Sequence, residues 1–198
     1  MFTRLIFMNK AIFLDRDGTI NVEKDYLYRI QDFEFLPGVI EALYNLQNND
    51  YHLIIVTNQS GIARGYYLED DFTRLNEWMK ENLKKHGIFL DAVYYCPHHP
   101  NAKINKYRLE CECRKPKLGM FQQAIKDLNI DIDQSFAIGD KIRDCAICCS
   151  TKCKGFLIGN NEKFEIVSSV KKGEYHNIQY ADDLLDASRS ILLQNGGI

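Results

Sequence analysis

Short hydrophobic runs recur along the chain, and most of them lead directly into polar residues. The runs occupy residues 11–14, 52–56, 92–95, 135–138 and 155–158. Because they do not alternate between apolar and polar positions, they predict strands buried on both faces of a sheet. Between the runs, hydrophobic residues recur at helical spacing. This second pattern predicts helices over residues 38–48, 69–85, 118–128 and 182–193.

The alternation of strands and helices predicts an α/β fold, in which a doubly wound parallel sheet is connected by right-handed crossovers. A length of 198 residues suits one domain, spanning 1–198, better than two. Residues 97–117 show no clear element. A loop of that length inside a compact domain is usually functional.

Polar residues follow three of the predicted strands. Asp15 and Asp17 follow the first run, Thr57 and Asn58 the second, and Asp140 the fourth. Ligands of open α/β sheets bind beyond the carboxyl ends of the strands, so we expect these side chains to meet there. Two carboxylates one residue apart repel each other unless a cation neutralises them, which favours a magnesium site. The alternative is a strand followed by an Asp-Gly turn, with Asp17 as a turn former only.

Charge and composition argue against some classes of function and indicate a cellular location. The formal net charge is −2, so bulk electrostatics attracts neither nucleic acid nor an anionic membrane. The first ten residues lack a signal-peptide pattern, and no stretch approaches the roughly 18 apolar residues of a membrane span. We therefore expect a cytoplasmic protein, in which the seven cysteines are mostly reduced.

Two close pairs of metal-binding residues flank the long loop. Cys96 and His98 stand at its start, and Cys111 and Cys113 lie near its end. Three thiolates and one imidazole make the closed tetrahedral set of a structural zinc ion. The spacing alone does not exclude His99 in place of His98, or a set of unrelated buried thiols. The remaining cysteines fall on the helix expected after Asp140 and are expected to pack in the core as small hydrophobic residues; they are Cys145, Cys148, Cys149 and Cys153.

The strand-end residues together resemble the haloacid-dehalogenase superfamily. Its four motifs are matched in order by Asp15-Arg16-Asp17-Gly18-Thr19, by Thr57-Asn58, by Lys115, and by Gly139-Asp140 with Asp144 one turn on. The resemblance implies a Rossmann-like phosphatase fold. It implies that Asp15 is the nucleophile and a magnesium ligand, and that Asp17 is the general acid and base with its carbonyl also on the metal. Asp140 would hold the metal, while Thr57 and Lys115 would stabilise the phosphoryl group.

Longer motifs make the resemblance specific to one branch of this superfamily. Asn58-Gln59-Ser60-Gly61-Ile62-Ala63-Arg64-Gly65 and Cys113-Arg114-Lys115-Pro116 are similar to the D-glycero-D-manno-heptose 1,7-bisphosphate 7-phosphatases. That family is essentially capless and carries a zinc-binding loop, which corresponds to residues 96–113 and selects His98. Residues 1–7 precede its usual start. The substrate-binding residues that it implies are Glu23, Lys24, Asp25, Tyr26, Thr57, Asn58, Gln59, Ser60, Arg114, Lys115 and Lys141.

The sequence therefore predicts a monomeric, magnesium-dependent phosphatase that acts on a small phosphorylated sugar and binds one structural zinc. The resemblance implies removal of the C7 phosphate of a heptose bisphosphate, in the synthesis of heptose precursors for surface polysaccharide such as lipopolysaccharide. Histidinol-phosphate phosphatases share much of the same pattern and remain an alternative. A non-catalytic, zinc-containing interaction domain is an alternative of another class, although the intact Asp15, Asp17, Lys115 and Asp140 argue against it.

Overall fold

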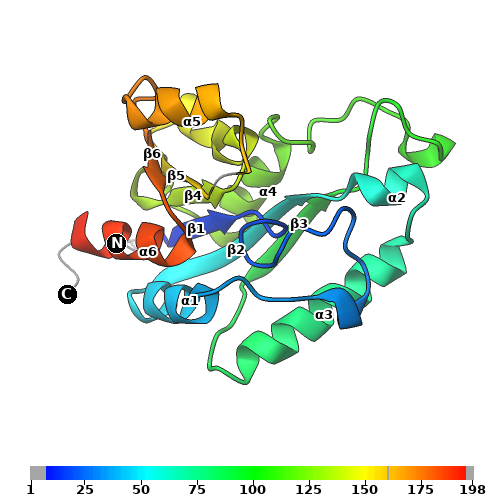
Figure 1. Ribbon diagram of the computed structural model, residues 1–198, viewed down its shortest axis with the longest axis horizontal. Helices are drawn as coiled ribbons and strands as arrows, with labels where there is room; N and C mark the ends of the chain where they lie inside the picture. The colour runs from blue at the N-terminus through cyan, green and yellow to red at the C-terminus, as the bar shows by residue number, and fades with distance from the viewer. Residues whose placement is uncertain (1–7, 160, 195–198) are drawn as a thin grey trace, which may run out of the picture.

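Six parallel strands form the centre of the molecule in the computed structural model, which describes residues 8–159 and 161–194. Their order across the sheet is β3-β2-β1-β4-β5-β6, and the ribbon in Figure 1 shows the helices on both sides of them. The strands are β1 (Lys10–Leu14), β2 (Tyr51–Asn58), β3 (Ala92–Cys96), β4 (Phe136–Gly139), β5 (Lys154–Ile158) and β6 (Ile178–Ala181).

The helices cover the two faces of the sheet in separate groups. The α-helices are α1 (Val39–Asn48), α2 (Ser60–Arg64), α3 (Glu69–Lys84), α4 (Gly119–Leu128), α5 (Phe164–Lys171) and α6 (Leu184–Gln194). Short 3-10 segments are η1 (Ile30–Asp32), η2 (Asn105–Tyr107), η3 (Ile132–Gln134) and η4 (Ile142–Cys149). One hydrophobic cluster joins the sheet to α1, α3 and α6. A second cluster joins its other face to α4, η4 and α5.

The register of β1 explains why its sequence does not alternate. Ile12 pairs with Leu53 of β2 on one side and with Phe136 of β4 on the other. Successive side chains of a strand point to opposite faces: Ile12 and Leu14 lie in the cluster with α1, and Phe13 lies in the cluster with α4. Both faces are buried, so both sets of positions must be apolar. This confirms the doubly wound parallel sheet.

The sheet reverses its winding between β1 and β4. The chain moves outward from β1 through β2 to β3 on one side, and from β4 through β5 to β6 on the other. Loops on the two sides diverge at that point and leave a crevice at the carboxyl ends, where ligands of such sheets bind. The residues that follow β1 and β4 are Asp15 and Asp140.

Most of the predicted elements are confirmed, and the differences have physical reasons. The short strand β6 and the helices α2 and α5 were not predicted, because each is brief. In β6 and α5, half of the residues or more are also polar or partly exposed. Residues 92–95 are only partly buried, because β3 is an edge strand rather than one covered on both faces.

The segment after Asp140 also differs from expectation. It forms the kinked 3-10 segment η4 in place of a regular helix. Cys145, Cys148 and Cys153 are buried as predicted, but Cys149 is exposed, so its assignment to the core was wrong. The backbone is kinked at Cys145, whose thiol still faces the sheet and donates to the carbonyls of Ala137 and Phe156 at 3.5 Å each.

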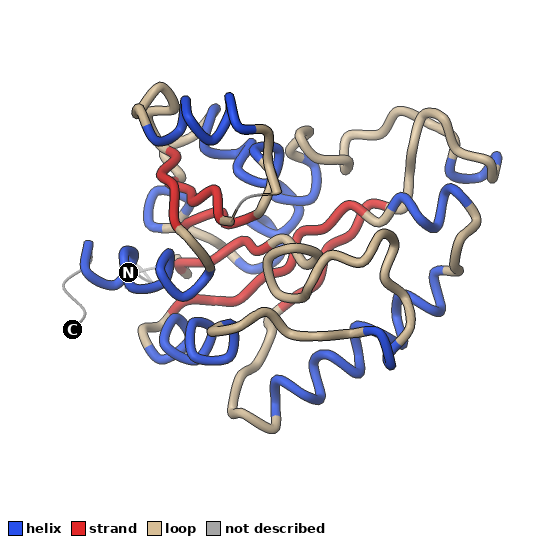
Figure 2. Tube along the Cα trace, viewed as in Figure 1, coloured by secondary structure: helices blue, strands red, loops and turns tan. Residues whose placement is uncertain are grey.

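The long loop between β3 and α4 lies over α2, as the tube in Figure 2 shows. The main-chain N–H groups of Lys103 and Ile104 both donate to the carbonyl of Ala63, at 3.1 Å each. Residues 1–7 lie outside the described residues, and the assignment of 1–198 to one domain stays a prediction. Over the part of the chain that the structure describes, no helix combines the length and the apolar character needed to cross a membrane.

Candidate active site

Asp15 continues β1 into the crevice. Its main-chain N–H donates to the carbonyl of Ile138 on β4, at 3.0 Å, so the backbone ladder holds the residue in place. The Lys115 ammonium donates to the Oδ1 atom of Asp15 at 2.8 Å. Burial raises the pKa of Asp15 to about 6, although the Lys115 charge opposes this rise. The carboxylate is thus a buried group paired with a single cation.

Lys115 reaches the site from the long loop and lies between two carboxylates. Its Nζ atom lies 2.8 Å from Asp15 and 2.7 Å from Asp144, and it also donates to the carbonyl of Val56 at 2.5 Å. Asn58 accepts a hydrogen bond from the main-chain N–H of Lys115 and donates one to its carbonyl. Asn58 therefore anchors the backbone of Lys115 to the end of β2.

Asp15, Asp140 and Asp144 form a cluster of carboxylates that fits a magnesium ion. Each offers one oxygen, and these oxygens lie within 4.8 Å of one another. Burial, with the nearby charge of Asp15, raises the pKa of Asp140 to about 7. Hard oxygen donors crowded in this way are the ligands that Mg²⁺ takes. The sequence motif placed Asp144 in this acidic site, although not as one of the metal ligands.

Asp17 lies beside this cluster but is held by other partners. Its carboxylate accepts hydrogen bonds from Arg16, Asn21 and Gln59. The prediction that its main-chain carbonyl joins the metal ligands stays a prediction. Its side chain is 16% exposed and lines the crevice, where a general acid has to lie.

The crevice consists of an inner and an outer cavity that share Asp17, Glu23, Asn58, Lys141 and Arg143. The inner cavity, of about 60 Å³, is also lined by Asp15, Thr57, Lys115, Asp140 and Asp144. The outer cavity, of about 420 Å³, is also lined by Asp25, Tyr26, Gln59, Ser60, Gly61, Arg64, Tyr67 and Arg114. The geometry therefore places a small acidic chamber beneath a wider opening with several cations.

The structure brings together all but one of the predicted substrate-binding residues. The exception is Lys24, whose ammonium donates to the carbonyl of Asp32 and pairs with Glu34 at 3.1 Å, away from the cavity lining. Arg64, Tyr67 and Arg143 line the outer cavity and were not predicted. Arg64 stood inside the motif that follows Asn58, and Arg143 stood beside Asp144, so position within a motif was the available signal.

The predicted zinc ligands meet beside the site. Cys113 Sγ lies 3.1 Å from the sulfurs of Cys96 and Cys111 and 3.3 Å from the Nδ1 atom of His98. These sulfurs are too far apart for a disulfide of about 2.05 Å, and their arrangement suits a shared ion. His99 is occupied elsewhere, since its Nδ1 accepts from Asn101 and its Nε2 faces Arg64.

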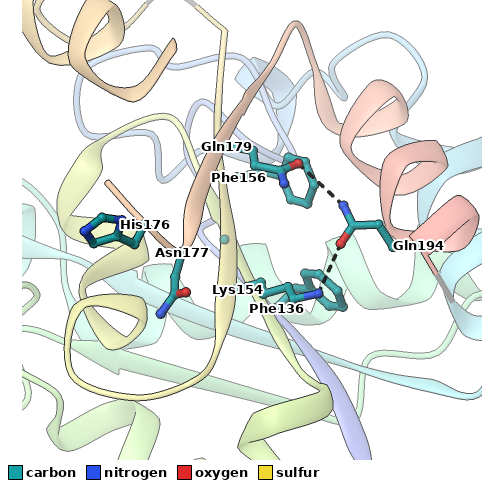
Figure 3. Close-up of a pocket in the computed structure, with 8 residues that line it drawn as sticks. Phe136, Lys154, Phe156, His176, Asn177, Gln179 and Gln194 are labelled. Carbon is teal, nitrogen blue, oxygen red and sulfur yellow. Dashed lines mark hydrogen bonds between the residues drawn. The ribbon is translucent and has the colours of Figure 1, made fainter. Parts of the chain in front are cut away.

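A further cavity lies at the opposite edge of the sheet, by the amino ends of β4 and β5. It encloses about 80 Å³, and Phe136, Lys154, His176 and Asn177 are among its lining residues. Figure 3 shows Gln194 bridging Gln179 and Lys154 across it. It is too small for a sugar phosphate, and no carboxylate is among its lining residues.

Comparison with known proteins agrees with this geometry. A family model described as Polynucleotide kinase 3 phosphatase matches residues 10–175. The D-glycero-beta-D-manno-heptose-1,7-bisphosphate 7-phosphatase of Haemophilus ducreyi is 56% identical over 136 residues, which are 68% of this chain and 74% of that protein. The protein of the same name from Pasteurella multocida is 48% identical over 168 residues, 85% of this chain and 91% of that protein. The chain belongs to this heptose bisphosphate phosphatase family.

A solved structure supports the same membership. The D,D-heptose 1,7-bisphosphate phosphatase of B. bronchiseptica, complexed with magnesium and phosphate, has a TM-score of 0.78 and 28% sequence identity. The match covers 93% of this chain and 99% of that one. The family resemblance that the sequence predicted, within the haloacid-dehalogenase superfamily, is confirmed.

Proposed function

We propose that the chain removes the C7 phosphate of D-glycero-D-manno-heptose 1,7-bisphosphate through an aspartyl-phosphate on Asp15. The observation that carries the proposal is the buried contact of 2.8 Å between Asp15 and Lys115 at the floor of an acidic chamber. A carboxylate held beside a fixed cation is suited to attack a phosphoryl group and form an acyl phosphate. The names of the relatives supply the substrate.

In the first half of the reaction, a carboxylate oxygen of Asp15 attacks phosphorus, and the bond from phosphorus to the C7 oxygen breaks. Asp17 gives its proton to that oxygen, so the sugar leaves as an alcohol. Lys115 and the hydroxyl of Thr57, both lining the inner cavity, stabilise the charge on the phosphoryl oxygens. Such fixed donors and charges account for most of the catalysis of phosphoryl transfer.

In the second half, a water molecule attacks the phosphorus of the aspartyl-phosphate. Asp17, now a carboxylate, accepts the proton of this water and acts as the general base. The acyl phosphate bond breaks, Asp15 is restored, and inorganic phosphate is released. One residue can serve both halves because it ends the first half without the proton that it must take up in the second.

Two metals belong to the proposal. Asp15, Asp140 and Asp144 would hold Mg²⁺, whose positive charge lowers the repulsion between these carboxylates and an incoming phosphate. Cys96, His98, Cys111 and Cys113 would hold a zinc ion without an open position, as in structural sites. Arg114 and Lys115 directly follow Cys113, so this second metal would fix the segment that carries both cations.

The outer cavity supports a substrate with a second phosphate. Arg64, Arg114, Lys141 and Arg143 line it, and such cations bind phosphate through charge-assisted hydrogen bonds. Its volume of about 420 Å³ lies in the usual range for small-molecule sites. In this proposal Arg114 recognises the distal phosphate. The proposal also includes a cytoplasmic location, where the thiols of the zinc cluster would stay reduced. A role in heptose precursor synthesis and a monomeric state remain predictions.

Steady-state kinetics on two substrates tests this function. We expect kcat/KM for the β anomer of the heptose 1,7-bisphosphate to exceed that for histidinol phosphate by at least about 100-fold, since histidinol phosphate offers nothing for the outer cations to bind. Phosphorus NMR of the product should show that the C7 phosphate has been lost. Equal rates, or a preference for histidinol phosphate, would reject the proposal. Asp15→Asn should be inactive on both, which excludes a contaminating phosphatase.

A further inference from the structure

The carboxylate of Asp17 is enclosed by donors that have no part in the mechanism described so far. Arg16 donates from Nε to Oδ1 at 3.2 Å and from Nη2 to both oxygens, at 3.0 and 2.9 Å. Asn21 donates to Oδ1 at 3.0 Å, and Gln59 donates to Oδ2 at 2.9 Å. A side chain with this many partners has one orientation, and the partners decide where it points.

Arg16 cannot itself contact a substrate. The residue is 0% exposed and is not among the residues that line the crevice. Its remaining contacts are the carbonyl of Leu27, the Gln59 side chain and the ring of Phe72. A buried guanidinium is costly unless it is paired, and Asp17 is its ion-pair partner. Its effect on the chemistry must therefore act through Asp17.

Gln59 has no hydrogen-bonding capacity left for a substrate. Its Nε2 donates to Asp17 Oδ2 at 2.9 Å and to the Oγ1 atom of Thr57 at 3.0 Å. Its Oε1 accepts from the hydroxyl of Tyr67 at 2.5 Å and from Arg16 at 3.4 Å. An amide offers two donors and accepts two bonds, so every position is used. The prediction that this side chain binds substrate does not fit that saturation.

Tyr67 sets the direction of the Gln59 amide. The Tyr67 hydroxyl donates to Oε1, which forces the Nε2 end to face Asp17 and Thr57. Burial raises the pKa of Tyr67 above its usual range, so the hydroxyl keeps its proton. Because Thr57 Oγ1 accepts from Gln59, the Thr57 proton is left free to donate to a phosphoryl oxygen.

We propose that Arg16, Gln59 and Tyr67 are positioning residues that aim the Asp17 carboxyl at the leaving-group oxygen and turn the Thr57 hydroxyl toward the phosphoryl group. This inference rests on the proposed phosphatase function and deepens it. A general acid contributes in proportion to the need of the leaving group for a proton. A misdirected Asp17 should therefore slow the hydrolysis of esters with a basic leaving oxygen. It should slow much less the hydrolysis of esters whose leaving group departs without a proton.

The test compares three phosphate esters: the heptose 1,7-bisphosphate, phenyl phosphate and 4-nitrophenyl phosphate. The alcohol oxygen of the sugar needs a proton most and 4-nitrophenolate least. The quantity compared is kcat/KM, because this parameter reports the steps up to release of the alcohol and excludes hydrolysis of the aspartyl-phosphate. Tyr67→Phe removes one hydroxyl and keeps the ring that stacks on Tyr28. Arg16→Met keeps the volume without the charge.

Two further variants serve as references for the losses in kcat/KM. Asp17→Asn removes the acid itself and gives the full dependence on the leaving group. Tyr28→Phe is the matched control, because its hydroxyl accepts from Arg29 and its ring is the one stacked on Tyr67. A general structural effect of losing a tyrosine hydroxyl in this stack would appear in Tyr28→Phe as well.

We expect Tyr67→Phe to lower kcat/KM by about 10-fold for the sugar phosphate, by less for phenyl phosphate, and by less than about 3-fold for 4-nitrophenyl phosphate. Arg16→Met should show the same order with losses of about 100-fold, the scale of a catalytic group displaced by about 1 Å. Tyr28→Phe should match wild type on all three esters.

Equal losses on phenyl and 4-nitrophenyl phosphate in Tyr67→Phe would overturn the inference, whether or not Arg16→Met folds. Failure of the proposed function looks different: wild type would then hydrolyse the aryl esters but not the heptose bisphosphate. In that case the two aryl esters alone still decide whether Tyr67 and Arg16 position the acid.

Discussion

Asp15 and Asp140 end two adjacent strands, and burial raises the pKa of these residues to about 6 and about 7. Repulsion from Asp144 and Asp17 further raises the pKa of Asp15, and repulsion from Asp15 and Asp144 further raises the pKa of Asp140. Lys115, between Asp15 and Asp144, offsets only part of this cost. The site is therefore destabilised as it stands, and a bound cation would relieve it.

Magnesium should stabilise the protein more at neutral than at acidic pH. The folded-state pKa values of Asp15 and Asp140 lie above the value of 3.8 for a free aspartate. Between pH 3.8 and about pH 7 these two carboxyl groups bind more protons in the folded chain than in the unfolded chain. The free energy of unfolding therefore falls as the pH rises through this range. At about pH 5 protons already neutralise the site, whereas at about pH 7.5 Mg²⁺ does so.

The measurement is thermal unfolding at both pH values, with and without added Mg²⁺. The rise in Tm that Mg²⁺ causes at neutral pH is compared with the rise that it causes at acidic pH. Comparing the shifts cancels the contribution of groups outside the site. Asp140→Asn should show a smaller shift at neutral pH. A Tm shift that is the same at both pH values in the unmodified chain would contradict the assignment of these carboxylates to magnesium.

Asp15→Asn should abolish turnover and keep the fold. The amide has nearly the volume of the carboxylate but cannot form an acyl phosphate, so we expect kcat to fall by at least about 1,000-fold. Lys115 keeps its contact of 2.7 Å with Asp144 and is not left as an unpaired buried charge. Circular dichroism and kcat together check both statements. Substantial activity in a folded Asp15→Asn protein would exclude the aspartyl-phosphate mechanism.

Besides its main-chain bonds to Ala63 and to the side chain of Asn58, the loop from β3 to α4 is held by two groups of side chains. The cysteine and histidine cluster gathers its ends around Cys96 and Cys113. Its middle is tied to the start of α3, where Glu69 accepts hydrogen bonds from the hydroxyls of Tyr95 and Tyr107. These bonds lower the pKa of Glu69. The second attachment does not depend on a metal.

Cys111→Ser should lose the zinc ion and loosen the end of the loop near Arg114. Purified wild-type protein should carry about one zinc per chain, because four closed ligands form a complete site. Activity should fall by about 100-fold through misplaced Arg114 and Lys115, and added magnesium should not restore it. Hydrogen exchange should increase at residues 108–117 and much less near Tyr107, where Glu69 still holds the loop.

Cys149→Ser is the matched control, since Cys149 is exposed and lies outside the cluster. It should keep both zinc and activity. Metal analysis of the three proteins, read beside their kinetics, settles the role of the ion. If the wild-type protein is fully active without zinc, the four side chains only pack together and do not form a metal site.

On the scale of the whole molecule, the net charge is negative, whereas the lining of the outer cavity carries more cations than carboxylates. The chain carries a formal charge of −2, yet Arg64, Arg114, Lys141 and Arg143 line the outer cavity against the carboxylates of Asp17, Glu23 and Asp25. Cations in a cavity with low-dielectric walls concentrate the field and attract anionic substrates. The local arrangement should therefore outweigh the net charge in the capture of a bisphosphate.

The value of kcat/KM for the bisphosphate should fall as salt increases from about 0.01 M to about 0.1 M, over which the Debye length shrinks from about 30 to about 10 Å. Arg143→Gln should lower kcat/KM at low salt and flatten this dependence. Arg189→Gln, on α6 and paired with Glu41, should leave it unchanged. A rate that rises with salt would mean that repulsion by the net negative charge dominates.

The fold and the meeting of the strand-end carboxylates followed from the sequence because both depend on local order along the chain. Five of the strands contain a short apolar run, as burial on both faces requires of the inner strands β1, β2, β4 and β5. Asp15 and Asp140 stand at the ends of two of these runs, so a parallel sheet brings them to one edge whatever the details of packing. The predicted zinc ligands occur as two close pairs, and their spacing is visible without coordinates.

The tertiary structure decided which side chains of each motif are held by other residues of the chain. Gln59 stood among the predicted substrate ligands, but its amide is fully used by Asp17, Thr57, Arg16 and Tyr67. Lys24 stood among them too, but it pairs with Glu34. The hydrogen bonds that saturate Gln59 join residues up to 43 positions apart, as between Arg16 and Gln59. A motif records which residues are adjacent in the chain, whereas their roles depend on partners that only folding brings within about 3 Å.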